Sequence, residues 1–430
     1  MNLSRATGGR GIWSRMPVNR YLPFDALPFL PNGRSPAAIA SAVRTGERVF
    51  LSGRSALRPD GTVAGLGDPA AQAHAAMDQI EAALTAAGGT LSDITKLTTT
   101  LIDRAHRKPV YDVIGQRLRD VFPVSTGLVV AGLPLPELMV QIDADATIGA
   151  PIQRVRTFGL NQWFGQPIAF QGAMVAAGTG ELFIRGQTGA ALDGSSMAGP
   201  GRRPEDAAAQ ADLALSNLET LLAEAGSGLD EVCKITVYIG DRAYRSAVYP
   251  IIGKHFRGIH PVSTGIIVPG FARPEILFEI DVQAMRKQDG PHQRFRRYHS
   301  DTAKYGREQQ SLGCDFCMAV RAGSRVILRG QTGDDLNEVM HGLNDAARQA
   351  ETAMDNVETL LTDAGAGLAD VTKATLFVTD RAYLAGAADA VLRRLRGTTP
   401  AFSAMIVKGL ASPELLMEVD ITANLGSPAA

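Results

Sequence analysis

Residues 261–281 read PVSTGIIVPGFARPEILFEID, and the same pattern returns at 123–143 as PVSTGLVVAGLPLPELMVQID and at 400–420 as PAFSAMIVKGLASPELLMEVD. Each copy holds an apolar, β-branched run, a turn with a proline, and an alternating run that ends in aspartate. This arrangement predicts two β-strands joined by a turn. Because the pattern occurs three times in 430 residues, the repeat decides the fold.

Other signals keep the same spacing. The tripeptide Asp-Arg-Ala begins at 103, 241 and 380, so its copies are 138 and 139 residues apart. That period is the length of a domain, since solenoid units run to about 20–50 residues. Each copy also has a glutamine 24 residues before a lysine: Gln72 and Lys96, Gln210 and Lys234, Gln349 and Lys373. We expect three like domains that imitate a symmetric trimer, with the informative clefts between domains.

The expected division of the chain follows from the repeat. It consists of an N-terminal tail at 1–34, a first domain at 35–148, a second at 149–286 that includes a leading linker, a linker at 287–311, a third domain at 312–424 and a tail at 425–430.

The second copy shows the expected order of elements. GELFIRGQTG at 180–189 predicts a strand and a turn, and leucines spaced by three and four residues after Pro204 predict a helix. CKITVYIGD at 233–241 alternates like a half-buried strand, and a second helix follows with Pro250 expected in its first turn. With the strand pair the order is β–α–β–α–β–β, which predicts a two-layer α+β domain.

Composition excludes several classes of protein. A net charge of −1 gives no basic field for nucleic acid or anionic lipid, so we expect neither as a partner. No apolar run approaches the ~18–20 residues that span a membrane. Three cysteines are too few for a disulfide framework, which favours a cytoplasmic location. Cys314 and Cys317 lack a second ligand pair, and no dinucleotide or P-loop motif occurs, so we expect no metal and no cofactor.

These features together resemble the Rid (YjgF-like, reactive intermediate deaminase) family. The resemblance rests on the order of elements, the SGR or RGQTG strand ends, the A-x-Q-A helices and the P-x-S strand before an acidic last strand. It covers 35–148, 165–286 and 312–424. It implies chorismate-mutase-like domains in a single-chain pseudo-trimer, with a central sheet barrel, outer helices and up to three inter-domain clefts. It further implies hydrolysis of enamines or imines without a cofactor.

The chain departs from the family pattern at the expected site. The family's carboxylate-binding Arg falls at Ser125, Ser263 and Phe402, its helix-proximal Asn at Tyr111, Tyr249 and Ala388, and its water-positioning acid at Gln141, Glu279 and Glu418. Loss of the Arg in every copy leaves two functions open. One is a hydrolase or deaminase acting on a small C–N substrate (an enamine, imine or amide), and the other is a non-catalytic small-molecule binding or regulatory protein.

Arginines and hydroxyls offer replacement chemistry. Arg185 and Arg329, each in an RGQTG motif with Gln187 or Gln331, could form a relocated anion clamp, or could form structural pairs on the sheet. The adjacent hydroxyls are Ser125 with Thr126 and Ser263 with Thr264. A serine becomes a nucleophile only beside a base, for which the strand-opening lysines are candidates; otherwise these hydroxyls orient a ligand.

Paired carboxylates offer acid–base chemistry. Glu279 with Asp281, and Glu418 with Asp420, lie two residues apart, so each pair shares one strand face and one member is expected to have a raised pKa. Tyr111 and Tyr249 are candidates for ligand stacking, with core packing as the alternative. The predicted catalytic residues are Ser125, Ser263, Thr264, Glu279 and Glu418. The predicted substrate-binding residues are Thr126, Tyr111, Tyr249, Arg185, Arg329, Gln187 and Gln331. Phe402 and Ala388 make the third cleft apolar, so clefts with Ser125 or Ser263 are favoured.

Overall fold

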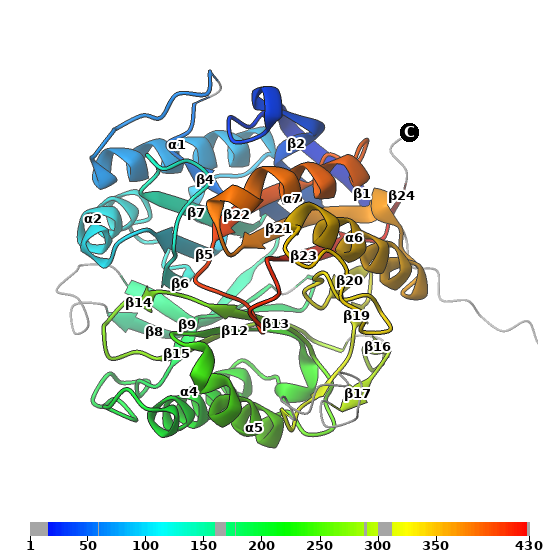
Figure 1. The fold of residues 1–430 in the computed structure, drawn as a ribbon. Helices are drawn as coiled ribbons and strands as arrows, with labels where there is room; N and C mark the ends of the chain where they lie inside the picture. The colour runs from blue at the N-terminus through cyan, green and yellow to red at the C-terminus, as the bar shows by residue number, and fades with distance from the viewer. Residues whose placement is uncertain are drawn as a thin grey trace, which may run out of the picture.

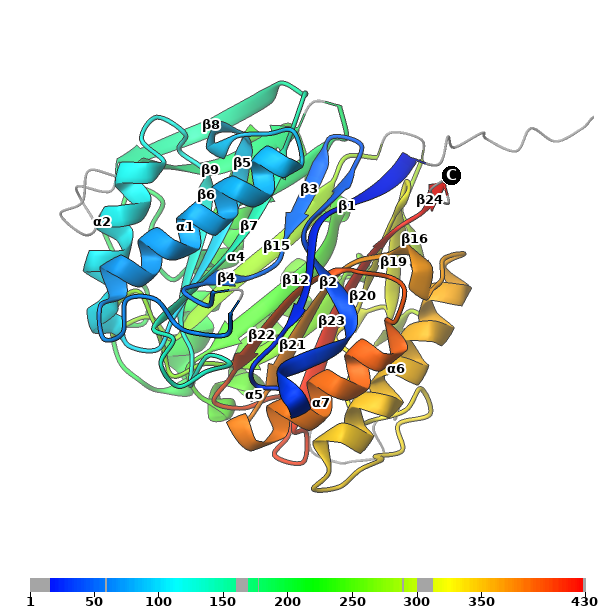
Figure 2. The ribbon, with the colours of Figure 1, turned by 90° about the horizontal axis from the view of Figure 1, so that it is seen from above.

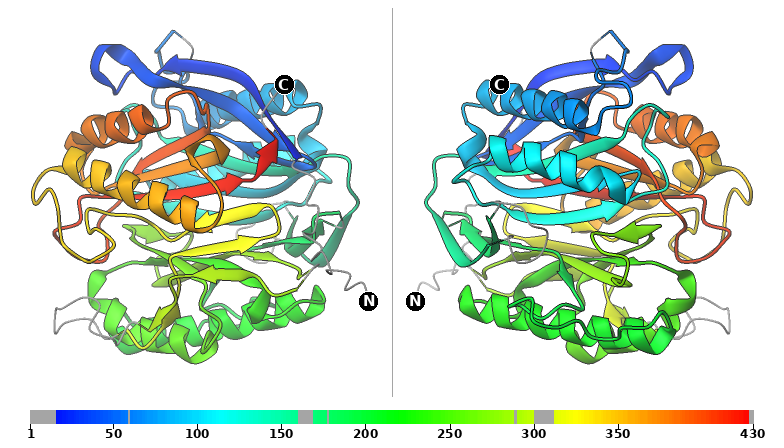
Figure 3. Two further views of the ribbon diagram at one scale, coloured as in Figure 1. Left: turned by 90° about the vertical axis from the view of Figure 1, so that its right-hand side faces the viewer. Right: turned by 90° about the vertical axis from the view of Figure 1, so that its left-hand side faces the viewer.

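The computed structural model describes residues 16–58, 60–159, 169–176, 178–287, 290–299 and 312–427. Three pairs of helices lie on the outside and the strands lie between them (Figures 1 and 3). The first part contains β1 Met16–Ala26, β2 Arg34–Thr45, β3 Arg48–Leu51, β4 Arg54–Ser55, α1 Pro69–Ala86, β5 Ile94–Leu101, α2 Arg107–Arg117, β6 Val124–Val129 and β7 Val140–Thr147. The second contains β8 Ile152–Gly159, β9 Ala169–Ala176, β10 Glu181–Ile184, β11 Gln187–Thr188, α4 Pro204–Glu224, β12 Val232–Ile239, α5 Arg245–His255, β13 Val262–Ile267, β14 Gly270–Phe271 and β15 Phe278–Met285. The third contains β16 Gln293–Phe295, β17 Tyr298–His299, β18 Asp315–Phe316, β19 Ala319–Ala322, β20 Arg325–Leu328, α6 Ala346–Asp363, β21 Val371–Val378, α7 Arg381–Arg394, β22 Ala401–Ile406, β23 Met417–Asn424 and β24 Gly426–Ser427.

Each repeat folds as the sequence predicted, into α+β layers. The parallel strand pairs β5/β6, β12/β13 and β21/β22 are connected by the second helix of each repeat, as a parallel pair requires. The last long strand of each repeat then runs antiparallel to the first member of the pair. Apolar faces of both helices and one face of the sheet form a core in every repeat.

The repeated Asp-Arg-Ala motif serves two structural purposes. Its aspartate is an N-cap, as Asp103 shows by accepting a hydrogen bond from the Ala105 N–H at 2.8 Å. Its arginine reaches the next domain in a cyclic order. Arg104 donates to the Phe271 carbonyl, Arg242 to Leu410 and Arg381 to Leu133, each at 3.0 Å. The motif therefore joins the three domains to one another.

The repeated glutamine joins the first helix of each domain to the turn before its last long strand. Gln210 is fully buried; its amide donates to the Glu275 carbonyl at 2.9 Å and accepts from the Leu277 N–H at 2.8 Å. Gln72 and Gln349 make the same two bonds to the corresponding turns. Because a buried amide group needs hydrogen-bond partners, these two bonds fix the turn that leads into the last strand.

Strand pairing corrects the expected closed barrel. The described strands form separate sheets of nine, seven, six and two strands, not one closed sheet. Domains are joined instead by short pairings at their edges, such as β14 with β6 and the bridge between Ile267 and Gly409. Pairing of strands across each junction stops after one or two residues, so the sheets surround the centre of the molecule without merging.

Three local expectations also need correction. Pro250 lies in the middle of α5 instead of its first turn, because the helix already begins at Arg245, directly after a 3-10 turn at 242–244. Linker segments add edge strands, with β8 on β9 and β16 on β19. Part of the expected N-terminal tail is also a strand, since β1 pairs with β2 and with the C-terminal β24 (Figure 2). Among the described helices, none has the length and apolar character needed to cross a membrane.

Candidate functional site

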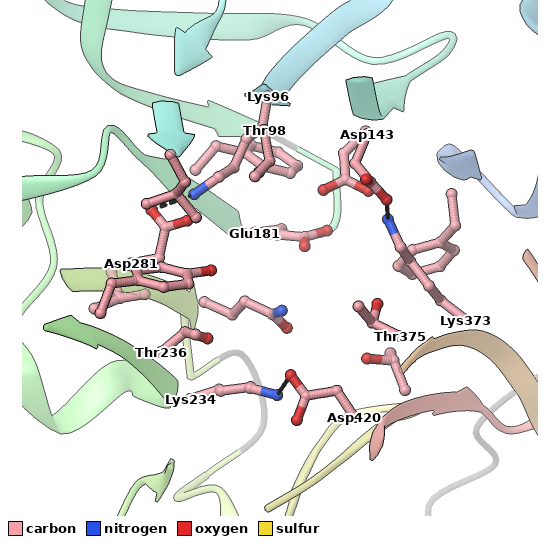
Figure 4. A pocket seen from close by; sticks show the side chains of 18 of the residues that line it. Lys96, Thr98, Asp143, Glu181, Lys234, Thr236, Asp281, Lys373, Thr375 and Asp420 are labelled. Atoms are coloured by element: carbon pink, nitrogen blue, oxygen red, sulfur yellow. Dashed lines mark hydrogen bonds and ion pairs between the residues drawn. The ribbon is translucent and has the colours of Figure 1, made fainter. Parts of the chain in front are cut away.

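A polar cavity of about 140 Å³ lies where the three domains meet. Figure 4 shows one lysine and one aspartate from each domain around its wall. Each lysine pairs with the aspartate of the next domain: Lys96 with Asp281 at 2.7 Å, Lys234 with Asp420 at 2.6 Å and Lys373 with Asp143 at 3.1 Å. This volume holds only a few water molecules, at roughly 30 Å³ each. We refer to these six residues as the central ring.

Hydroxyl groups complete the central ring. Thr126 donates to Asp281 at 2.7 Å, and Thr264 donates to Asp420 at 2.5 Å. Because neighbouring residues of a strand point to opposite faces, Ser263 faces away from the ring while Thr264 faces it. The lysines therefore pair with aspartates and not with serines in the described residues, which removes the structural basis for a Ser–Lys dyad.

A second set of charges lies beside the central ring. Equivalent positions in the three repeats hold Arg48, Glu181 and Arg325, all at least 95 % buried. One Glu181 oxygen lies 2.6 Å from Arg325 Nη1 and the other lies 3.2 Å from Arg48 Nε. The Arg48 guanidinium also lies between the rings of Phe50 and Phe183, at 4.8 and 4.6 Å. Two arginines and one glutamate thus meet where three identical subunits would bring one residue three times.

A cleft of about 470 Å³ lies between the second and third domains. The second domain contributes Arg245 and Tyr249 from α5 and Ser263 from β13. The third domain contributes Arg329, Gln331 and Glu418 from the opposite wall. Five residues predicted from the sequence are therefore brought together here: Ser263, Tyr249, Arg329, Gln331 and Glu418. Thr264 contacts the central ring instead.

Glu418 is the most perturbed carboxyl group of this cleft. It is 96 % buried, next to Gly330 of its own domain and the Thr264 hydroxyl of the second domain. Burial raises the pKa of Glu418 to about 8, and the nearby charge of Asp420 acts in the same direction. Arg329, Lys234 and Arg245 oppose this shift. A carboxyl group with this pKa can exchange a proton near neutral pH.

The junction of the first and second domains repeats this arrangement. Burial raises the pKa of Glu279 to about 8, with Asp281 adding to the shift and Arg107 and Arg185 opposing it. Tyr111 is buried on α2, and burial lowers the pKa of Arg185, which lies within electrostatic range of Glu279 and Tyr111. Ser125 is buried, and its carbonyl accepts from the Gly186 N–H at 3.3 Å. In the first repeat, Gln141 replaces the acid and donates to Asp143 at 3.2 Å.

The RGQTG glutamines support the loop as well as the cleft. Gln187 donates to the Arg185 carbonyl and Gln331 to the Arg329 carbonyl, both at 2.7 Å. The Arg329 guanidinium lies 5.5 Å from the centre of the Tyr298 ring, on the wall of the larger cleft. The predicted position of Arg329 at a cleft is thus observed, while its part in binding stays a prediction.

Sequence reasoning missed Arg245 and its equivalent Arg107. Arg245 is 94 % buried and donates to the Tyr249 hydroxyl at 3.1 Å, with its guanidinium 4.4 Å from the centre of that ring. A Cβ atom at Gly265 would lie 2.5 Å from the Tyr249 hydroxyl, so glycine leaves the space that these groups occupy. The signal in the sequence was an Arg and a Tyr four residues apart in two repeats.

The junction of the third and first domains is packed with apolar side chains. Phe402 is 94 % buried, and it shares a core with Leu384, Ala388 and the N-terminal residues Leu27 and Leu30. Its N–H donates to the Ser52 hydroxyl of the first domain at 2.8 Å. The buried Arg54 lies 5.0 Å from the ring of Phe24 in β1. The chain's own N-terminal segment therefore packs at this junction.

Metal ligands do not gather in the described residues: no group of three or more His, Cys, Asp or Glu side chains is placed to hold an ion. The three cysteines are buried and form no disulfide.

Fold and site together define a chain of three repeated α+β domains, with a cleft at the junction of the second and third domains and an equivalent set of polar residues at the junction of the first and second. Residues 34–148, 173–286 and 311–425 each match the family model described as Endoribonuclease L-PSP, so the chain belongs to this family. The resemblance to Rid and YjgF-like proteins is thereby confirmed.

The chain is also similar to several solved structures. A YjgF/YER057c/UK114 family member from Mycobacterium tuberculosis is 33 % identical, over 25 % of this chain and 86 % of that one, with a TM-score of 0.23. A protein of unknown function from Pseudomonas aeruginosa is 30 % identical, over 31 % and 94 % of the two chains, with a TM-score of 0.26. A chorismatase is 16 % identical, over 77 % and 93 %, with a TM-score of 0.48.

Proposed function

We propose that this protein is a cofactor-independent hydrolase that cleaves a C–N bond of a small molecule in its inter-domain clefts. The observation that carries the proposal is Glu418, a buried carboxyl group with a pKa of about 8 on the wall of a 470 Å³ cleft. Buried acids with perturbed pKa values in a cleft are typical of acid–base sites. Family membership supports small-molecule chemistry of this kind.

The proposed arrangement is a pseudo-trimer made by one chain. The cyclic contacts support it, since the Asp-Arg-Ala arginines and the central ring both run from each domain to the next. In this arrangement the cleft of Glu418 and that of Glu279 are the active ones, and the junction at Phe402 is structural. Three buried thiols fit a reducing cytoplasm.

The proposed reaction on an imine needs one residue that gives and takes a proton. Protonated Glu418 donates to the imine nitrogen, and its carboxylate then accepts a proton from water as the water oxygen bonds to the carbon. Glu418 then returns this proton to the nitrogen of the carbinolamine. As the C–N bond breaks, its carboxylate takes the proton of the carbinolamine hydroxyl, so that the products are a carbonyl compound and ammonia and Glu418 is protonated again. The Ser263 hydroxyl, on the opposite wall of the cleft, orients the water or the substrate.

Release of ammonia from enamines, imines, amides and ureides tests the proposal. We expect turnover by the intact chain and a loss of about 10²–10⁴-fold in kcat for Glu418→Gln, the range for removing a general acid or base. Glu137→Gln, at an exposed turn position, is the matched control and should keep full activity. Ligand binding that saturates, with no turnover on any class of substrate, would favour the alternative of a binding or regulatory protein.

A further inference from the structure

We propose that Arg245, Tyr249 and Gly265 form a carboxylate-binding subsite in the cleft between the second and third domains. The inference rests on the proposed function of this cleft and specifies one end of the ligand. We expect the ligand to be an organic monocarboxylate with an apolar or planar body.

The first argument is the state of the Arg245 guanidinium. It lies in a wall of the cleft and is 94 % buried, yet its Nε has no hydrogen-bond partner among the described residues. Its Nη1 donates a hydrogen bond to the Tyr249 hydroxyl. Burying a charged donor without a partner is costly, so such a group is retained where a ligand supplies the partner. The edge formed by Nε and Nη2 matches the two oxygens of a carboxylate.

The second argument is that the repeats change three residues together. The first repeat has Arg107, Tyr111 and Gly127, and a Cβ atom on that glycine would lie 2.5 Å from the Tyr111 hydroxyl and 2.6 Å from Arg107 Nη1. The third repeat has Leu384, Ala388 and Ala404 at the same positions. There the junction is packed with Phe402 and N-terminal side chains. The Arg–Tyr–Gly set is therefore present at the two polar junctions and absent at the apolar one.

The rest of the cleft indicates the body of the ligand. Tyr298, Phe316, Met318 and Leu415 supply apolar and aromatic surface within about 470 Å³. This is within the range of about 300–1,000 Å³ for small-molecule sites. Acids line another part of the cleft, Asp334, Asp335 and Glu338 among them, and they disfavour a second negative charge on the ligand.

Calorimetric titration with 3-phenylpropionate and with its neutral amide tests the subsite. The measurements use full-length Arg107→Leu protein, so that only the cleft of interest retains the complete Arg–Tyr–Gly set. We expect one site that binds the carboxylate at least 10-fold more tightly than the amide. Adding Arg245→Leu, the residue found in the third repeat, should weaken carboxylate binding by about 10–100-fold and leave amide binding unchanged. Arg245→Lys keeps the charge and the fold but loses the planar edge, and should give an intermediate loss.

Equal binding of acid and amide, or a change below about 2-fold in Arg245→Leu, would overturn the subsite. The outcome is separate from that of the proposed reaction. Carboxylate binding that needs Arg245, without ammonia release from any substrate, would refute the hydrolase and keep the subsite. Suppose instead that turnover depends on Glu418 but changes neither with Arg245→Leu nor with removal of the carboxylate from the substrate. That result would keep the hydrolase and refute the subsite.

Discussion

Replacing Glu418 by glutamine should change how the stability of the protein depends on pH. The folded carboxyl group keeps its proton up to a pH of about 8, whereas an ordinary glutamate loses it near 4.5. Between these values the unfolded chain binds fewer protons than the folded one, so the stability contributed by this group falls as pH rises. Glu418→Gln removes this dependence and should leave a protein that is relatively more stable at high pH.

The size of the effect follows from the two pKa values. A rise from 4.5 to about 8 corresponds to at most about 5 kcal/mol, at 1.36 kcal/mol for each pH unit. An unfolding entropy of about 2.1 cal/mol/K per residue gives roughly 0.9 kcal/mol/K for a chain that unfolds as one unit. The Tm difference between Glu418→Gln and the parent should therefore grow by about 5 °C from pH 5 to pH 9.

Thermal unfolding by circular dichroism at pH 5, 7 and 9 measures this difference. The chain supplies its own precedent for the substitution, because Gln141 occupies the same position in the first repeat. For Glu279→Gln, the Tm difference from the parent should also grow between pH 5 and pH 9. For the control Glu137→Gln, at an exposed position, the Tm difference should be the same at all three pH values. A Tm difference for Glu418→Gln that is the same at pH 5 and pH 9 would refute the assignment of a buried, protonated acid.

Further predictions concern the charges and the apolar junction. Lys234→Met should lower stability by about 3–5 kcal/mol in chemical denaturation, because Asp420 is left buried without its partner, and adding Asp420→Asn should restore most of the loss. The same single substitution should raise the pH at which activity declines, since Lys234 holds down the pKa of Glu418; an unchanged pH profile would contradict this. Glu181→Gln should destabilise by a similar amount, because two buried arginines lose their shared carboxylate, and an unchanged denaturation midpoint would count against it. Phe402→Ser should cost about 3–5 kcal/mol of stability and leave the rate of ammonia release unchanged; a matching loss of kcat would place chemistry at the third junction.

Elements with strong local periodicity were predictable from the sequence. The helices and the strand pairs follow from spacing alone, and they agree with the structure. Pro250 was misplaced because the preference of proline for a first turn was given more weight than the start of the helical pattern at Arg245, where α5 begins. The closed barrel was inferred from the family, and contacts between sheet edges are too short and too irregular to be read from periodicity.

The candidate site was only partly predictable, because it is assembled from different domains. The pairing of Glu418 with Asp420 on one face followed from their spacing of two residues. Which lysine meets which aspartate depends on the order of the domains in space, so the central ring could not be anticipated. Arg245 was overlooked because it lies on a helix whose pattern predicts core packing. Only a comparison of α5 with α7 shows that the residue at this position differs between the repeats.

The meeting of Arg48, Glu181 and Arg325 has a consequence for how the gene can be rearranged. Three polypeptides cut from this chain would not be equivalent, since only the second carries the carboxylate of Glu181. Loss of the second repeat would leave Arg325 without this carboxylate, whereas Arg48 would keep Asp145 of its own repeat at 3.2 Å. The second repeat is therefore the one whose removal we expect to unbalance the buried charges most.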